Sequence, residues 1–298
     1  MRGSIRALAK GDAVTVAGER ERGVWRALRA DRMAMAGLAI IAIVVAMALA
    51  APLLFPLDPL DSVGRPLIAP FETWRHPLGT DRLGRDLAAG VFHGAQVSLA
   101  IGALAALLAV GIGVLAGATA GYYRGWIDEA LMRVVEAFQT VPSFVLALAL
   151  VAVLGPSISS SIIAVALSTW TQSARLVRAE YLSLGQRDFV RACRALGMRD
   201  GAIMFRHILP NALPPVIALA TLTMAIAILV ESALAFLGLG DPNRVSWGAM
   251  IGSGRALLRT AWYVSAVPGV AIALTVLGIT MFGEGLNAAL DPRRMRRS

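Results

Sequence analysis

Residues 191–210 read RACRALGMRDGAIMFRHILP, and this stretch separates two long apolar runs of the chain. It carries four arginines, an aspartate and a histidine, whereas the chain of 298 residues is 57% hydrophobic and only 16% charged. Ordinary soluble domains carry about 25% charged residues, so the composition indicates a membrane protein. The charged stretch is then an element that lies outside the bilayer between two of its spans.

Apolar runs of about 20 residues, the length that crosses a bilayer, predict an all-α membrane protein. The six predicted transmembrane helices are residues 33–55, 96–120, 132–154, 158–173, 213–237 and 264–287. The fourth is the weakest, because it is short and rich in serine. The first run has 23 residues, longer than the apolar part of a signal peptide (about 7–15), so we interpret it as an uncleaved helix.

Glycines and prolines predict local features of these spans. Gly113, Gly117 and Gly121 recur every four residues in and just after the second span, a spacing that lets two helices approach closely. Pro142 and Pro268 are expected to kink or break the third and sixth spans. In the loop after the first span, Asp81 or Asp86 is expected to cap a short helix that runs to His93 at the outer interface.

Lys and Arg are distributed unevenly between the segments that join the spans. Of the 28 such residues, 21 lie in 1–32, 121–133, 174–212 and 290–298, and 7 lie in the alternate segments. The positive-inside rule then places both termini and 174–212 in the cytoplasm. The net charge of +9 follows from this topology and does not indicate binding to nucleic acid.

These patterns divide the chain into four parts. They are a basic cytoplasmic segment 1–32, a first helix with its external loop 33–92, a core of five helices 93–290 that includes the loop 174–212, and a basic cytoplasmic tail 291–298. The loop has helical character: Asp188 is expected to cap one short helix and Gly197 to end it. Asp200 is expected to cap a second short helix, whose inward residues are Ile203, Met204 and Ile208.

The first of these helices has one apolar stripe. Phe189, Ala192, Cys193 and Leu196 recur at i, i+3, i+4 and i+7. An amphipathic helix of this kind rests either on membrane lipid or in a groove of another protein. Because the stripe is small, it is a poor lipid anchor and is better suited to a protein groove.

The spacing Ala192-x4-Gly197-x11-Leu209-Pro210 resembles the EAA loop of ABC transporter permeases. In that family the loop forms a coupling helix that docks on a cytoplasmic ATPase subunit. Arg191 stands where the family usually has glutamate, and Cys193 stands where it has a second alanine. The resemblance implies these ATPase-coupling residues: Phe189, Arg191, Ala192, Cys193, Leu196, Gly197, Leu209 and Pro210.

The resemblance covers roughly residues 30–295. Within the family, the chain resembles the oligopeptide/dipeptide/nickel branch, in particular the second, C-type permease of that branch. Five motifs carry it: HPLGTDRLGRD (76–86), FRHILPNALPP (205–215), ALAFLGLG (233–240), SWGAM (246–250) and GEGLNAALDPR (283–293). It implies a multi-pass type I importer permease of a bacterial inner membrane that works by alternating access. The implied partners are a homologous second permease, two cytoplasmic ATPase subunits that use ATP and Mg, and an external substrate-binding protein. The substrate that the resemblance implies first is a di- or oligopeptide, with nickel or another small solute as the alternatives.

Other readings depend on a few residues. Lys10 is the only lysine, so the G-x-x-x-x-G-K-[ST] loop that binds ATP is absent, and neither hydrolase motif H-E-x-x-H nor G-x-S-x-G occurs. We therefore expect no enzyme activity and no bound cofactor. Glu231 lies within the fifth span, where it is either a packing residue or part of the pathway, and a proton-coupled secondary transporter is the alternative function. No metal site is expected, since His76, Asp81, Asp86 and His93 are irregularly spaced.

Overall fold

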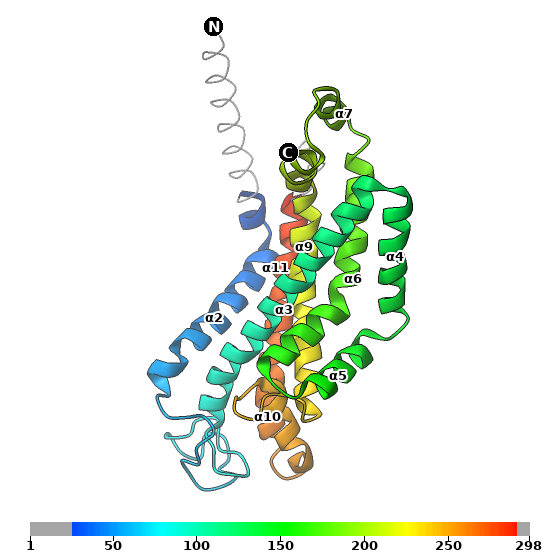
Figure 1. Cartoon of the computed structure of the whole chain (residues 1–298). Coiled ribbons are helices and arrows are strands. Elements are labelled where there is room, and N and C mark those ends of the chain that lie inside the picture. Colours follow the sequence, from blue (N-terminus) through cyan, green and yellow to red (C-terminus); the bar gives the residue numbers. More distant parts are fainter. Residues whose placement is uncertain (1–25, 291–298) are drawn as a thin grey trace.

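The computed structural model describes residues 26–290, which form a bundle of helices (Figure 1). The segment 1–32 lies mostly, and the tail 291–298 entirely, outside the described residues. The α-helices are α2 (Arg32–Leu54), α3 (Leu87–Tyr123), α4 (Gly125–Gln139), α5 (Ser143–Leu154), α6 (Ile158–Leu184), α7 (Asp188–Ala195), α8 (Asp200–Ala202), α9 (Leu209–Phe236), α10 (Trp247–Gly254) and α11 (Tyr263–Leu290). A π-helical turn, Ile203–Ile208, joins α8 to α9, and a short 3₁₀ turn, Arg255–Leu257, follows α10.

Within residues 26–290, four helical segments are long and apolar enough to cross a membrane by themselves. They are Arg32–Leu54, Leu87–Tyr123, Asp200–Phe236 and Tyr263–Leu290. They confirm the first, second, fifth and sixth predicted spans. Helix α11 continues through Pro268, so this proline does not interrupt it.

The third predicted span, 132–154, is not one helix. Helices α4 and α5 meet at an angle of 84° at Pro142, which is the residue before the first turn of α5. Proline cannot donate the backbone hydrogen bond that would continue α4, and the break that Pro142 was expected to cause is confirmed. Together the two helices count as at most one broken span.

The fourth predicted span, 158–173, is the first part of α6, which has 27 residues and ends at Leu184. Its serines, threonines and arginines make α6 less apolar than the other spans. In the part of the chain that the structure describes, four helices meet the criterion of length and apolar composition, or five if the bent pair counts as one span, so this criterion does not reach the predicted count of six. Helix α6 nevertheless runs alongside α3 through the bundle (Figure 1). Hydroxyl groups such as that of Thr169 donate to the helix's own carbonyl oxygens, here Val165 O at 2.8 Å.

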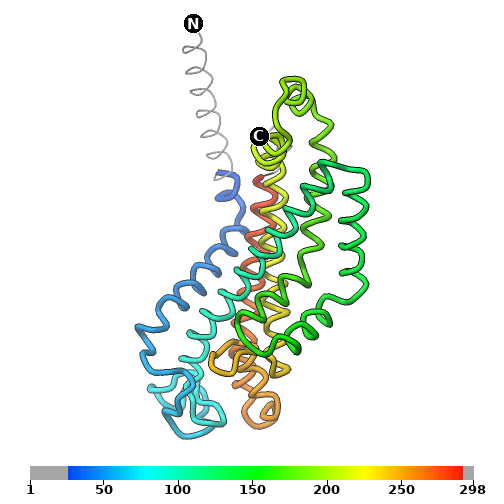
Figure 2. Tube along the Cα trace, in the orientation of Figure 1, coloured from blue at the N-terminus to red at the C-terminus, as the bar shows by residue number. Residues whose placement is uncertain are grey.

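The glycine ladder of the second span explains why α6 lies so close to α3. A Cβ atom added at Gly113 would lie 2.4 Å from Ser173 Cβ, and one at Gly117 would lie 2.3 Å from Ala174 O. At Gly121 it would lie 2.6 Å from Tyr181 Cβ. All three contacts are with α6, which confirms that the ladder is a site of close helix packing. Helix α3 thus crosses the bundle between α2 and α6 (Figure 2).

The start of α3 corrects two predictions. Asp86 caps α3 itself, since its Oδ1 accepts from the N–H groups of Ala88 (2.7 Å) and Ala89 (3.4 Å). Of the two expected caps, Asp81 and Asp86, it is therefore Asp86 that caps a helix, and the short helix expected to end at His93 is the beginning of a 37-residue helix. The predicted boundary between 33–92 and 93–290 falls inside this helix, since the helix runs from Leu87 to Tyr123.

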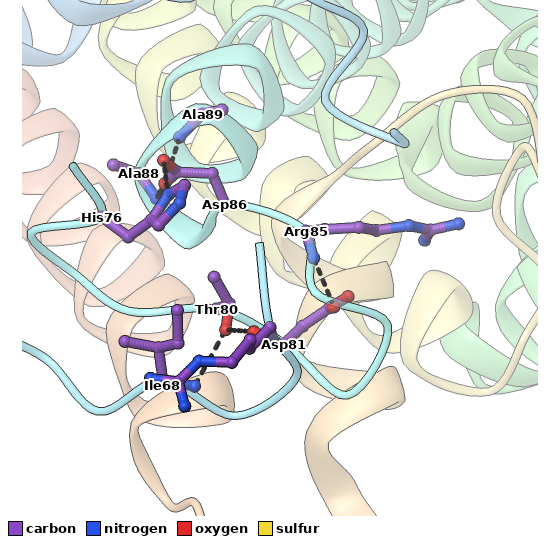
Figure 3. A network of polar contacts seen from close by, with 9 residues as sticks. Ile68, His76, Thr80, Asp81, Arg85, Asp86, Ala88 and Ala89 are labelled. Atoms are coloured by element: carbon purple, nitrogen blue, oxygen red, sulfur yellow. Dashed lines mark hydrogen bonds and ion pairs between the residues drawn. The ribbon is translucent and has the colours of Figure 1, made fainter. Parts of the chain in front are cut away.

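The motif HPLGTDRLGRD folds into a compact network at this end of α3 (Figure 3). His76 Nδ1 lies 2.8 Å from Asp86 Oδ2, and both side chains are buried. Thr80 Oγ1 accepts from the Ile68 N–H at 2.9 Å, and Asp81 Oδ1 accepts from the Arg85 N–H at 2.9 Å. The polar groups therefore hold the loop 64–86 against the first turn of α3.

Candidate functional site

Residues 185–208, which we call the α7 segment, lie at one end of the bundle, beyond the end of α3 (Figure 1). The first turn of α2 and the last turn of α11 lie at the same end and pack on each other through Ala34 and Ala289. The α7 segment joins α6 to α9. Its position in space is therefore tied to two long helices of the bundle.

A buried cluster fixes the α7 segment to the helices beneath it. Its members are Ala118, Tyr122, Val177, Tyr181, Val190, Ile203, Met204, Ile208, Ala212 and Val216. The inward positions predicted for Ile203, Met204 and Ile208 are confirmed. Since the cluster joins residues from α3, α6, α7 and α9, the α7 segment packs as part of the bundle.

Helix α7 ends as the sequence predicts. Gly197 has a left-handed backbone with φ of +68°, which glycine adopts without strain. Its N–H donates to Arg194 O at 3.0 Å, and the N–H of Met198 donates to Cys193 O at 3.2 Å. This pair of hydrogen bonds is the Schellman motif, which ends a helix by satisfying its last carbonyl groups.

The two predicted aspartate caps are wrong. Asp188 is the first residue of α7, and the position before it, Arg187, makes no side-chain cap. Asp200 likewise begins α8, and its Oδ1 accepts a hydrogen bond of 2.6 Å from the Tyr122 hydroxyl on α3. The Asp200 carboxylate, which was expected to cap its own helix, is thus bonded to a distant residue, Tyr122.

Two tyrosines connect the α7 segment to α3 and α6. The Arg194 guanidinium lies over the Tyr122 ring, 5.3 Å from its centroid. The buried Tyr181 hydroxyl of α6 donates to Met204 O at 3.0 Å. Neither tyrosine was singled out in the sequence, because a tyrosine near a helix end has no pattern that identifies its partner.

The second predicted short helix is instead continuous with the fifth span. Residues Asp200–Phe236 form one helical segment of 37 residues that includes the π-helical turn. In that turn the N–H of Leu209 donates to Met204 O, five residues earlier. Pro210, in the first turn of α9, cannot donate to the carbonyl four residues before it. Asp200 therefore belongs to the same continuous helical segment as α9.

The predicted apolar stripe of α7 is divided between two faces. Phe189, Ala192 and Leu196 are exposed, at 38% for Phe189 and 81% for Leu196, and so form an outward surface. Cys193 is half-buried and packs against the inner cluster, where Val190 is completely buried. Val190 was missed because the stripe was drawn through Phe189, one residue earlier.

The remaining predicted coupling residues are Arg191, Gly197, Leu209 and Pro210. Arg191 is exposed and makes only a weak contact of 3.8 Å with the exposed Asp188. Gly197 and Pro210 are exposed, whereas Leu209 is half-buried against the inner cluster. The structure therefore places Arg191 beside the exposed apolar residues of α7 and assigns Leu209 to the inner packing.

Glu231 lies inside the subunit. Its side chain is 2% exposed, and its Oε2 is 3.4 Å from both the Ser98 hydroxyl of α3 and the Ser232 hydroxyl. Ser98 Oγ also accepts from the Trp247 N–H of α10 at 3.4 Å. Of the two roles left open by the sequence, these contacts favour packing, because the carboxyl group is enclosed by helices of its own chain.

The residues considered for a metal site have other partners. His76 pairs with Asp86, Asp81 holds a turn, and His93 Nε2 lies 2.9 Å from Phe55 O. Within residues 26–290, no three His, Cys, Asp or Glu side chains come together in a way that could hold a metal ion.

Two family models match the sequence. Residues 109–296 match the family described as "binding-protein-dependent transport system inner membrane component". Residues 22–70 match the "N-terminal TM domain of oligopeptide transport permease C". The first match covers more than half of the chain and includes the whole α7 segment.

Curated relatives align over almost the whole chain. The dipeptide transport system permease protein DppC of Alkalihalophilus pseudofirmus is 39% identical over 278 residues, which cover 91% of this chain and 90% of the relative. The di/tripeptide transport system permease protein DppC of Pseudomonas aeruginosa is 38% identical and covers 90% of this chain and 91% of the relative. The glutathione transport system permease protein GsiD of Escherichia coli is also 38% identical, covering 90% of this chain and 89% of the relative.

A solved structure shares the fold. The chain superposes on the inward-facing MetNI methionine ABC transporter with a TM-score of 0.55 and 17% sequence identity. The match covers 68% of this chain and 96% of the chain in that structure. It confirms the predicted type I importer permease fold.

Proposed function

Because this chain belongs to the family of inner membrane components of binding-protein-dependent transport systems, we propose that it carries di- or oligopeptides inward as one of two different permease subunits of an ATP-driven importer. It is a membrane-spanning ABC importer permease and not an enzyme. The relatives give no support to a proton-coupled transporter that uses Glu231. Their names as dipeptide, di/tripeptide and glutathione permeases favour a peptide substrate over nickel.

The outward surface of α7 is the proposed contact with an ATPase subunit. Exposed Phe189 and Leu196 can fill apolar pockets of a groove, and exposed Arg191 can pair with an acidic rim. A carboxylate is absent at position 191, so the docking contact uses a cation there. The ATPase subunits bind the ATP and Mg, and this chain binds no cofactor.

The proposed coupling depends on the rigid attachment of α7. Val190 and the ring of Tyr122 hold α7 to the bundle, and the helix from Asp200 continues into α9 without a break. When two ATPase subunits close on ATP, a pull on α7 biases the bundle between two packed arrangements. An external binding protein supplies the substrate on the other side.

The proposed location is a bacterial inner membrane, with both termini and α7 in the cytoplasm. Three observations support this orientation: 21 of 28 Lys and Arg lie in the segments assigned to that side, and the start of α2 and the end of α11 lie at the α7 end of the bundle. Lipid surrounds the exposed apolar faces of the long helices, and nucleic acid has no role.

A cysteine crosslink tests the docking contact. Cys193 is half-buried toward the inner cluster, so it is a poor reporter. We would replace it by alanine, place Leu196→Cys on the outward surface, and co-express the subunit with an ATPase that carries single cysteines along its groove. We expect a short bifunctional reagent to join Leu196→Cys to the ATPase, with a yield that changes when ATP is added.

The matched control is Ile203→Cys, because Ile203 is completely buried in the inner cluster and should not crosslink. Equal yields at positions 196 and 203, or no crosslink at 196 in an assembled complex, would rule out the proposed docking surface.

A further inference from the structure

A groove runs along α9 at the half of the bundle that carries α7, with α6 and α11 as its walls. Its volume is about 330 Å³. Apolar residues of α9, including Ala218, Leu219 and Leu222, form the floor. The polar side chains that line it are Thr221, Thr280, Glu284 and Asn287. We call this the α9 groove.

Two glycines hold α11 so that Glu284 lines the groove. A Cβ atom added at Gly283 would lie 2.1 Å from Thr221 Oγ1 of α9, and one added at Gly285 would lie 2.3 Å from Ala34 Cβ of α2. Helix α11 is therefore pressed against α9 on one side and α2 on the other. Glu284, between the two glycines, is exposed.

The groove offers hydrogen-bond acceptors. The Thr221 hydroxyl donates to Ala218 O at 2.8 Å, and the Thr280 hydroxyl donates to Val276 O at 2.8 Å. Since each hydroxyl proton is used within its own helix, the oxygen lone pairs remain available to the groove. Within residues 26–290, no hydrogen bond or ion pair reaches the Glu284 carboxylate. The groove therefore combines a carboxylate that has no ion-pair partner within residues 26–290 with neutral acceptors, and the Asn287 amide adds both an acceptor and donors.

The charge of Glu284 favours contact with water or with a polar partner over contact with lipid. Glu284 precedes the end of α11 at Leu290 by six residues, which is about 9 Å along the helix axis. A carboxylate within a span is costly in hydrocarbon, and such groups normally face water or a bound partner. An ammonium group matches the site, because it carries a positive charge and three donors but no acceptor.

We propose that the α9 groove binds the amino-terminal ammonium group of a peptide on the cytoplasmic half of the pathway, with Glu284 as its counter-ion. The apolar floor on α9 would contact the first side chain of the peptide. This inference rests on the proposed peptide importer, and it adds a ligand group and a binding site within this subunit.

Charged thiol reagents test the electrostatics of the groove. In a Cys193→Ala background, Leu222→Cys places a thiol on the floor without removing any of the four polar side chains. Inside-out vesicles that contain the whole importer are treated with a trimethylammonium or a sulfonate methanethiosulfonate reagent. Glu284→Gln should lower the ratio of the cationic to the anionic labelling rate about fivefold or more. Glu136→Gln is the matched control, since Glu136 is an exposed carboxylate of α4 outside the groove, and it should leave the ratio unchanged.

Peptide protection tests the ligand. Ala-Ala added to the cytoplasmic face should slow labelling of Leu222→Cys, whereas N-acetyl-Ala-Ala at the same concentration should not. The proposal is overturned if Leu222→Cys reacts with neither reagent, if Glu284→Gln keeps the original ratio, or if both peptides protect equally. Peptide uptake by the unmodified importer distinguishes failure of the groove proposal from failure of the proposed function. If the importer takes up peptide normally, any of these results rejects only the groove. If it takes up no peptide, the proposed function is rejected.

Discussion

Replacing Gly197 by proline should abolish transport while leaving the subunit in the membrane. Gly197 has φ of +68°, and proline fixes φ near −65°, so the chain would have to rotate by about 130° at this bond. The N–H that donates to Arg194 O is also removed, and the neighbouring bond from Met198 to Cys193 O depends on the same turn. A proline that conflicts with its backbone in this way costs about 3 kcal/mol or more.

That cost is large compared with the stabilisation from the few contacts that hold α7 against the bundle. Helix α7 has eight residues and only one completely buried side chain, Val190. Its connection to Asp200 runs through the turn at Gly197, so the proline should displace α7 from the inner cluster. The exposed docking surface would then no longer be held in one orientation.

A graded series separates backbone geometry from side-chain size. No atom lies within 4 Å of a Cβ added at Gly197, so alanine meets no steric clash and pays only the left-handed backbone, about 1–2 kcal/mol. Asparagine tolerates this conformation better than alanine. ATP-dependent peptide uptake, measured per assembled complex, should therefore fall in the order Gly, Asn, Ala, Pro. Uptake at the normal rate by an assembled Gly197→Pro complex would refute the reasoning.

Three further predictions concern the bundle. Tyr122→Phe removes the hydrogen bond to Asp200 and should lower the free energy of unfolding of the purified subunit by about 1 kcal/mol, with reduced ATPase stimulation by peptide; unchanged values in both assays would contradict a positioning role. Glu231→Gln should keep peptide uptake close to normal, because an amide oxygen can accept from Ser98 and Ser232 as the carboxyl does; loss of uptake in an assembled complex would indicate a pathway role. Gly117→Leu should prevent close packing of α3 on α6, since a Cβ alone would lie 2.3 Å from Ala174 O, and the purified subunit should be clearly less stable in thermal unfolding. The control Gly111→Leu should not reduce stability, because no atom lies within 4 Å of a Cβ added at Gly111.

Local patterns were sufficient for much of this protein. Apolar runs predicted the helices that begin near Arg32 and end near Leu290, and a small-residue period predicted the contact of α3 with its neighbour. Gly197 predicted the end of a helix, because the left-handed turn that ends a helix is made by hydrogen bonds between residues no more than five positions apart. The motifs predicted the family because they too are short segments, which occur in a fixed order along the chain.

Long-range packing decided the rest. The stripe on α7 predicted an amphipathic helix, but only the contact with Tyr181 and its neighbours determined that Val190 and Cys193 face inward and that Phe189 and Leu196 face outward. Asp200 was expected to bond locally, but Tyr122, 78 residues away in sequence, is brought to it by the fold. A sequence period specifies which residues share a face, whereas the neighbour that covers that face depends on how distant helices pack.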